Sequence, residues 1–140
     1  MIPLSVTPTQ TLQGTLSFTV TICEVLSIVS FMQSAFPPAA RRQFGHLSAS
    51  SCAGIEYLDV LSGHVDFSLY RTTKPWDHAA GTLMLGEAGG NSMRFDGQPY
   101  APAQPINAGL IAAAHPQTLA IVRTLFEAVR LPLLAGLPRA

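Results

Sequence analysis

The sequence predicts a single α/β domain over residues 1–140, with a largely buried sheet layered between helices. Helix-like and strand-like hydrophobic periodicities alternate from Ser48 onward, in the order helix, strand, helix, strand, strand, helix. Residues 109–114 are apolar without interruption, as expected of a short strand covered on both faces. A chain of 140 residues also has the commonest size of one domain.

The first third of the chain leans toward β-structure. Leu12–Phe18 begins as a strand, and the β-branched run Thr19–Ile22 extends it. Glu24–Met32 fits a helix and a strand equally well. Pro37-Pro38 is expected to stop any regular element, which places Arg41-Arg42 in a connecting loop.

The middle of the chain predicts a helix followed by a strand. Ser50 or Ser51 can cap the helix, and Gly63 is placed to terminate it. The helix face expected to enter the core carries Cys52, Ile55, Leu58 and Leu61. The strand has one buried face, because Val65, Phe67 and Leu69 alternate with Asp66, Ser68 and Tyr70.

A second helix follows a proline. Pro75 is expected to exclude helical structure up to Trp76, so the helix is predicted to begin at Asp77 and to end at Gly89-Gly90. The face expected to be buried carries Ala80, Leu83, Met84 and Ala88.

The last third predicts a hairpin, the buried strand and a final helix. Asn91–Phe95 alternates as a short strand, and Asp96-Gly97 is a strong turn signal before Gln98–Tyr100. Pro116 suits the first turn of the last helix, and residues 131–140 are expected to form a loosely held tail. The apolar stripe of that helix carries Leu119, Val122, Leu125, Phe126 and Val129.

Composition restricts the partners and the compartment. Eight Lys and Arg balance eight Asp and Glu, so there is no basic field for nucleic acid. Only 11% of residues are charged, against roughly 25% in a typical domain, which favours an apolar face covered by a partner. Cys23 and Cys52 lack metal-type spacing and are interpreted as reduced packing cysteines, which favours the cytoplasm.

The apolar stretch Thr15–Phe31 is considered as a membrane or export segment. It is slightly short for a span, carries Glu24 in its interior, and is preceded by no Lys or Arg. Core structure is therefore favoured, and no membrane association is expected.

Several motifs resemble the inositol monophosphatase family of magnesium-dependent sugar phosphatases. Residues 76–81, Trp-Asp-His-Ala-Ala-Gly, followed by Glu-Ala-Gly-Gly at 87–90, are similar to that family's second signature. The small-residue run at 48–54 resembles a family helix start, and residues 66–70 resemble the strand after it. The resemblance covers residues 12–129 and implies the fold of the family's carboxy-terminal half.

The resemblance implies a metal ligand and substrate contacts. Asp77 is the implied ligand of Mg²⁺, a hard cation that prefers carboxylate oxygen, although Asp77 could instead only cap its helix. Backbone amides at Ser51 and Cys52 would contact the substrate from a helix start. Tyr70 stands where well-known members carry a carboxylate for an inositol hydroxyl. Tyrosine cannot serve as an anionic acceptor, so inositol itself is in question.

The polar and aromatic neighbours of Asp77 are given simpler interpretations. Trp76 is expected to pack and fix its loop, and His78 to be an exposed histidine in the first turn of the helix. Arg71 and Lys74 could face a phosphate but are interpreted as solvated surface cations.

The family's first signature, Asp-Pro-x-Asp-Gly-Thr with an upstream Glu, is absent from these residues. The family mechanism is metal-assisted hydrolysis of a phosphate monoester, for which several carboxylates must converge. Magnesium gives up its waters reluctantly, so a lone Asp77 is expected to hold it weakly. The chain alone is therefore expected to be weakly active or inactive, with a second copy or a separate amino-terminal half as partner.

Three hypotheses remain open. The first is a shortened phosphatase of sugar or inositol phosphates whose other half is missing or encoded separately. The second is a non-catalytic binding or dimerisation module derived from the family. The third is membership of the related fructose-1,6-bisphosphatase or bisphosphate nucleotidase branches, which a basic substrate-facing cluster would favour.

Overall fold

The structure, a computed structural model, describes residues 15–21 and 24–128. Its strands are β1 Leu16–Thr21, β2 Phe44–Ser50, β3 Phe67–Tyr70, β4 Asn91–Met93 and β5 Leu110–Ala113. Its helices are α2 Val25–Ala35, α3 Pro38–Arg41, α4 Ala53–Leu61, α5 Pro75–Glu87 and α6 Pro116–Ala128.

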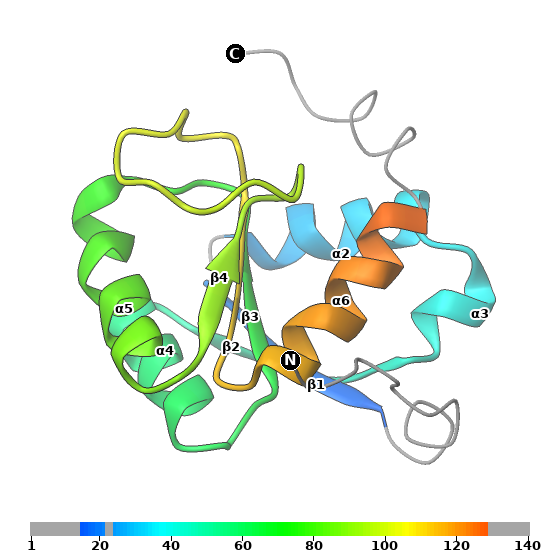
Figure 1. Cartoon of the computed structure of the whole chain (residues 1–140). Helices are drawn as coiled ribbons and strands as arrows, with labels where there is room; N and C mark the ends of the chain where they lie inside the picture. Colours follow the sequence, from blue (N-terminus) through cyan, green and yellow to red (C-terminus); the bar gives the residue numbers. More distant parts are fainter. Residues whose placement is uncertain (1–14, 22–23, 129–140) are drawn as a thin grey trace.

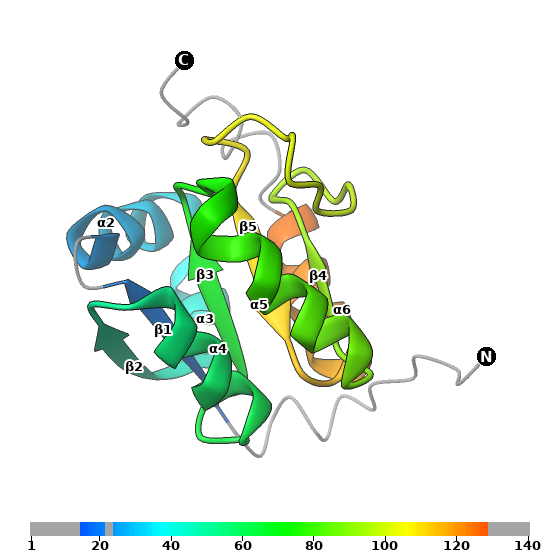
Figure 2. The ribbon, with the colours of Figure 1, turned by 90° about the vertical axis from the view of Figure 1, so that its left-hand side faces the viewer.

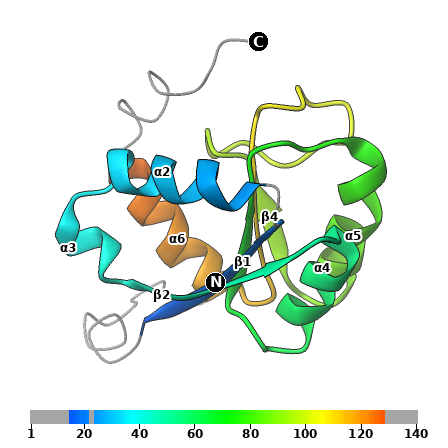
Figure 3. The ribbon, with the colours of Figure 1, turned by 180° about the vertical axis from the view of Figure 1, so that it is seen from behind.

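The five strands form one mixed sheet in the order β2-β1-β3-β5-β4. Strand β1 pairs in parallel with both β2 and β3, whereas β5 pairs antiparallel with β3 and β4. Helices α2 and α6 lie on one side of the sheet, and α4 and α5 lie on the other (Figures 1 and 3). The predicted α/β architecture, a sheet layered between helices, is confirmed.

Each face of the sheet has its own hydrophobic core. Side chains that alternate along the strands enter opposite cores, so Phe67 and Leu69 pack toward α2 and α6, while Tyr70 packs toward α4 and α5. The first core is rich in aromatic pairs, such as the stacked rings of Phe18 and Phe67, whose centroids are 5.3 Å apart. The second core is smaller and includes Tyr57 from α4 and Leu85 from α5.

Strand β3 corrects the expectation of one buried face, because all four of its residues are buried. It lies inside the sheet with helices on both sides, and its polar side chain, Ser68, is enclosed as completely as its apolar ones. Strand β2 was not predicted. It lies at the edge of the sheet and is half-buried along most of its length, so it lacks a clear alternation.

The ambiguous segment after β1 is the helix α2, and the expected stop at Pro37-Pro38 is only partly correct. Pro38 is the first residue of the one-turn helix α3, which includes Arg41. Similarly, α5 begins at Pro75 and not at Asp77, because a proline fits the first helical turn, where its missing N–H costs nothing.

The faces predicted for α4 and α5 are wrong. In α4 the side chains turned to the sheet are Glu56, Tyr57 and Val60, whereas the expected core residues Ile55 and Leu58 are exposed. In α5 the buried residues are His78, Gly81 and Leu85. Exposed residues of that helix include Trp76, expected to pack, and Ala80, Leu83, Met84 and Ala88, expected to be buried. Both helices carry apolar residues on two faces, and periodicity does not say which face meets the sheet.

The predicted chain reversals and the last third of the chain are confirmed. Gly63 and Gly89 follow α4 and α5 with positive φ of 80° and 87°, and Gly97 has φ of 85° in the hairpin turn. The strand β5 is completely buried, and α6 begins at Pro116 with Leu119, Val122 and Phe126 in the core.

Other expectations are settled only in part. Cys52 is a free thiol, as predicted, but it is exposed and does not pack. Thr15–Phe31 divides between β1 and the start of α2, and no helix within residues 15–21 and 24–128 is long and apolar enough to cross a membrane. Residues 12–14, Ile22, Cys23, Val129 and the predicted tail at 131–140 lie outside the described residues.

Candidate active site

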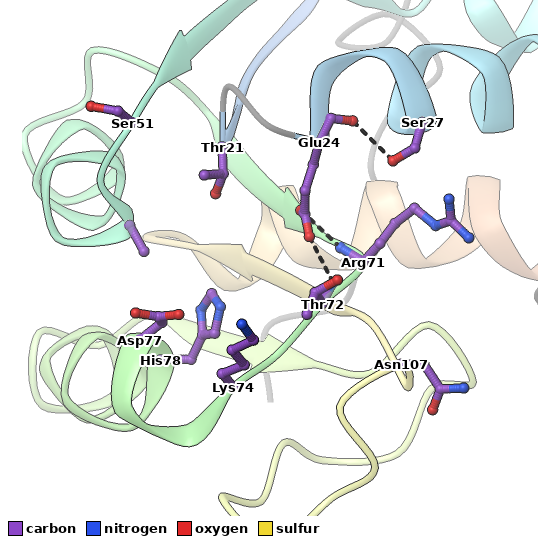
Figure 4. Close-up of a pocket in the computed structure, with 11 residues that line it drawn as sticks. Thr21, Glu24, Ser27, Ser51, Arg71, Thr72, Lys74, Asp77, His78 and Asn107 are labelled. Carbon is purple, nitrogen blue, oxygen red and sulfur yellow. Dashed lines mark hydrogen bonds between the residues drawn. The ribbon is translucent and has the colours of Figure 1, made fainter. Parts of the chain in front are cut away.

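A cavity of about 520 Å³ opens where the starts of three helices meet at one end of the sheet (Figure 4). Glu24 and Ser27 belong to the start of α2, and Ser51 and Ala53 to the start of α4. The start of α5 contributes Lys74, Asp77 and His78. Thr21, Arg71, Thr72 and Asn107 complete the lining.

The helix starts give this cavity a positive electrostatic character. The N-cap residues of α2, α4 and α5 are Glu24, Cys52 and Lys74, and none of the three makes a side-chain capping hydrogen bond. The first turn of a helix has N–H groups without helical partners and carries a partial positive charge. Three such starts around one cavity favour an anionic ligand.

Two cations add to this character. Lys74 is exposed at the cavity, and its Nζ lies 6.0 Å from the centroid of the Trp76 ring. Arg71 is half-buried there, and its Nε is buried without a hydrogen-bond partner among the described residues. The interpretation of Arg71 as a solvated surface cation is therefore wrong, because β3 ends against the cavity and places Arg71 in its wall.

Glu24 is a site residue that the sequence analysis considered only as a charge in an apolar segment. Its carboxylate accepts hydrogen bonds from the backbone N–H of Arg71 at 3.2 Å and of Thr72 at 2.8 Å. These bonds tie the start of α2 to the segment after β3 and hold the carboxylate in the cavity wall (Figure 4). Glu24 is the only charged side chain in the first 40 residues, and that isolation was the available signal.

Asp77 lies in the first turn of α5, exposed at the cavity, where the sequence placed the metal ligand. His78, expected to be exposed, is instead 3% exposed, and its Nδ1 lies 2.9 Å from the Tyr57 hydroxyl. Burial raises the pKa of Tyr57, so its hydroxyl stays protonated and donates to Nδ1. Burial also lowers the pKa of His78, with Asp77 acting in the opposite direction. A neutral His78 thus anchors the first turn of α5 and, with it, Asp77.

The three residues expected to contact substrate have different positions. Ser51 lines the cavity, and Cys52 is the exposed N-cap of α4 beside it. Tyr70 is 1% exposed and is not among the lining residues. Its ring lies behind the cavity, with its centroid 4.4 Å from that of His78. Tyr70 therefore supports the anchor of α5 from within the core.

Asn107 enters the cavity from a loop that crosses from the β4 hairpin to β5. The backbone N–H of Thr73 donates to the Ile106 carbonyl at 2.7 Å. Gln104, which is buried, donates through Nε2 to Thr73 Oγ1 and to the Gly109 carbonyl. These bonds fix the loop against the start of α5, and sequence periodicity gives no signal for such a contact.

The described residues do not assemble a complete divalent-cation site. No group of three or more His, Cys, Asp or Glu side chains converges within residues 15–21 and 24–128. Asp77 offers one oxygen donor group toward the cavity, whereas magnesium sites in proteins combine carboxylates with waters and substrate phosphates. Asp77 alone therefore does not fit a tightly held magnesium ion.

Comparison with known proteins agrees with the architecture. Residues 2–130 match the family model described as the inositol monophosphatase family. An inositol-1-monophosphatase of Bacillus subtilis is 35% identical over 68 residues, which are 49% of this chain and 25% of that protein. The structure of inositol monophosphatase II from Staphylococcus aureus has a TM-score of 0.68 at 15% identity, covering 86% of this chain and 44% of that one.

A Thermotoga maritima inositol monophosphatase gives a TM-score of 0.63 at 19% identity and covers 85% of this chain and 43% of that chain. At these identities the solved structures show the common fold, and this chain spans less than half of each. The signature around Asp77, the layered sheet and the match over residues 2–130 lead to the same conclusion: the chain belongs to the inositol monophosphatase family.

Proposed function

We propose that this chain forms the carboxy-terminal half of a magnesium-dependent phosphatase that hydrolyses a sugar or inositol phosphate monoester. The observation that carries the proposal is the convergence of Asp77 and three uncapped helix starts on one cavity. A phosphate group suits such a site, because helix N-termini and the cations of Lys74 and Arg71 all favour negative charge.

The alcohol part of the substrate would be bound by Glu24 and Asn107. Two of the lone-pair positions of the Glu24 carboxylate are used by the N–H groups of Arg71 and Thr72, which leaves others for substrate hydroxyls. The side-chain amide of Asn107 can both donate and accept. A carboxylate from α2 thus supplies the anionic acceptor that Tyr70 cannot. A related Staphylococcus aureus structure is described as bound to inositol monophosphate.

Catalysis requires carboxylates beyond Asp77. When bound, magnesium would supply Lewis-acid chemistry to the phosphate ester, and Asp77 would be one of its ligands. The further ligands would come from the amino-terminal half of the fold, which the matched structures contain and the 140 residues do not span. Without that half we expect weak activity or none.

The alternative is a non-catalytic binding or dimerisation module. The exposed apolar residues of α4 and α5 favour this reading, since a face of that kind serves association whether or not the site turns over. The two functions differ in whether phosphate is released.

A reconstituted phosphatase assay tests the proposal. The chain would be assayed alone and joined by a flexible linker to the amino-terminal half of the Bacillus subtilis inositol-1-monophosphatase. Phosphate release from a panel of sugar and inositol monophosphates would be measured with and without Mg²⁺. We expect Mg²⁺-dependent release only from the joined protein, lowered about 100-fold or more, or ~2.7 kcal/mol, by Asp77→Asn.

Two outcomes would contradict it. Absence of release from the joined protein would refute the phosphatase and leave the non-catalytic module. Full activity of the chain alone, abolished by Asp77→Asn, would show that the amino-terminal half is unnecessary.

The cationic wall of the cavity makes a second prediction. In the joined protein, Lys74→Met should raise the KM for the phosphate ester about 10-fold, or ~1.4 kcal/mol, with a smaller change in kcat, because Lys74 would bind phosphate in the ground state as well as in the transition state. Arg42→Met is the matched control, since it removes an exposed cation outside the cavity. Equal KM values for the two variants would exclude Lys74 from phosphate binding.

A further inference from the structure

The outer layer of the molecule, formed by α4 and α5, exposes a continuous apolar surface. The two helices pack side by side over the same face of the sheet (Figure 2). On α4, Ile55 is 52% exposed and Leu58 is 58% exposed. On α5, Trp76 is 79% exposed and Leu83 is 65% exposed. We call these four side chains, together with Met84, the α4–α5 face.

The spacing of these residues shows that they share one orientation. Trp76 and Leu83 are seven residues apart, which places them on one side of a helix, as the three-residue spacing of Ile55 and Leu58 does on α4. The sheet-facing side chains of both helices are fully accounted for by other residues, such as Tyr57 and Leu85. The α4–α5 face therefore points away from the sheet.

The opposite side of the molecule has a different surface. Helix α6 packs Leu119, Val122 and Phe126 into the core and exposes polar residues such as Gln117 and Arg123. That is the ordinary pattern of a helix facing water. Only the α4–α5 side combines an inward apolar stripe with an outward one, which is the pattern of a helix layer covered on both faces.

The α4–α5 face adjoins the incomplete site. Trp76 directly precedes Asp77, and Ile55 lies one turn into the helix whose start, at Ser51 and Ala53, lines the cavity. A protein layer seated on this face would therefore border the cavity at Asp77. Carboxylates delivered there would complete a donor set that the described residues lack.

The charges around the face argue against a second copy as its occupant. The ionisable residues of α4 and α5 are Glu56, Asp59, Asp77, His78 and Glu87, with no Lys or Arg in either helix. A symmetric contact would bring the surface carboxylates Asp59 and Glu87 of two copies into one interface, where like charges repel. The chain also spans only 43% to 44% of the length of two related structures, which provides a different occupant.

We propose that the α4–α5 face is the docking surface for the amino-terminal half of an inositol monophosphatase fold. This inference rests on the proposed function, because that half is also the source of the missing carboxylates. Docking covers Trp76, Leu83, Ile55 and Leu58, and it brings the ligands of the second half to Asp77. Lys or Arg residues of that half would lie opposite Asp59 and Glu87.

Trp76 provides a direct test, because it is the only tryptophan of the chain and lies on the face. The joined protein described above would be prepared with the tryptophans of its added half changed to Phe. We expect Trp76 to be strongly quenched by acrylamide in the chain alone. In the joined protein it should lose most of that quenching, and its emission should shift to shorter wavelength.

Matched variants locate the contact. Leu58→Glu combined with Leu83→Glu should return the quenching in the joined protein to the value of the chain alone, because docking would bury both charges without partners. Leu26→Glu is the control, since Leu26 is 86% exposed but belongs to α2 on the other layer. It should leave Trp76 protected. Circular dichroism of the chain alone checks that each variant folds.

The outcomes separate this inference from the proposed function. Trp76 that remains fully quenched in the joined protein, or protection lost in Leu26→Glu and kept in the double variant, would overturn the docking surface. A dimer of the chain alone that only the double variant dissociates would assign the face to a second copy and overturn the proposed occupant. Protection of Trp76 without phosphate release would leave the docking surface standing while the phosphatase proposal fails.

Discussion

Gly81→Ala should destabilise the protein by about 2–3 kcal/mol, although replacing glycine inside a helix normally stabilises it. Gly81 lies where α5 crosses α4, and a Cβ atom there would overlap the ring of Tyr57 at Cδ2 and Cε2. That ring has nowhere to go. It is completely buried, lies against Tyr70 with ring centroids 5.6 Å apart, and is held by its hydrogen bond to His78.

The expected loss reaches the site, because the easiest relief is a displacement of α5 away from α4. Such a shift would carry His78 and Asp77 with it and change the shape of the cavity. Gly86→Ala is the matched control in the same helix, since nothing lies within 4 Å of the added methyl group. It should gain roughly 0.5–1 kcal/mol. Urea denaturation of both variants measures the difference, and a Gly81→Ala variant as stable as Gly86→Ala would refute the close packing of the two helices.

Glu56→Gln should stabilise the protein at high pH by about 3 kcal/mol and remove part of its pH dependence. Glu56 is completely buried between α4 and the sheet, and burial raises its pKa from 4.5 to about 7. Hydrogen bonding from Tyr70 and Thr21 lowers the pKa, and the nearby carboxylates Glu24 and Asp59 raise it. The bond from Thr21 Oγ1 measures 3.2 Å, whereas Glu56 Oε1 and the Tyr70 hydroxyl have no well-aligned partner among the described residues.

The direction follows from proton binding. Between pH 4.5 and about 7 the folded protein holds a proton on Glu56 that the unfolded chain releases. The stabilisation by this proton is complete below pH 4.5, falls as pH rises and is lost above about 7. Glutamine is neutral at every pH and keeps an oxygen for Thr21, so Glu56→Gln lacks this decline.

The measurement is the free energy of unfolding across this pH range for wild type and variant. The lowered pKa of His78 acts in the opposite direction on acidification, so the difference between the two proteins isolates Glu56. Glu87→Gln, which removes an exposed carboxylate from α5, controls for the change in net charge. Parallel pH profiles of wild type and Glu56→Gln would show that Glu56 is already ionised in the folded protein.

The candidate site illustrates which residues a sequence can and cannot reveal. Asp77 was identified from a local signature, and Ser51 from the start of the helix it precedes, because both depend on neighbours in the chain. Glu24 acts through residues 47 and 48 positions away, and Asn107 is placed by Gln104 and Thr73. Contacts of that kind depend on how the chain returns to itself, and no local pattern encodes them.

By itself, the sequence determined the family, the α/β class, the order of elements after Ser48 and the glycines that reverse the chain at Gly63, Gly89 and Gly97. These features are local, since they depend on backbone freedom and on short-range periodicity. Only the tertiary structure decided which face of α4 and α5 is buried. Tyr57 rather than Ile55 meets the sheet, because a helix with two apolar faces is oriented by what packs against it.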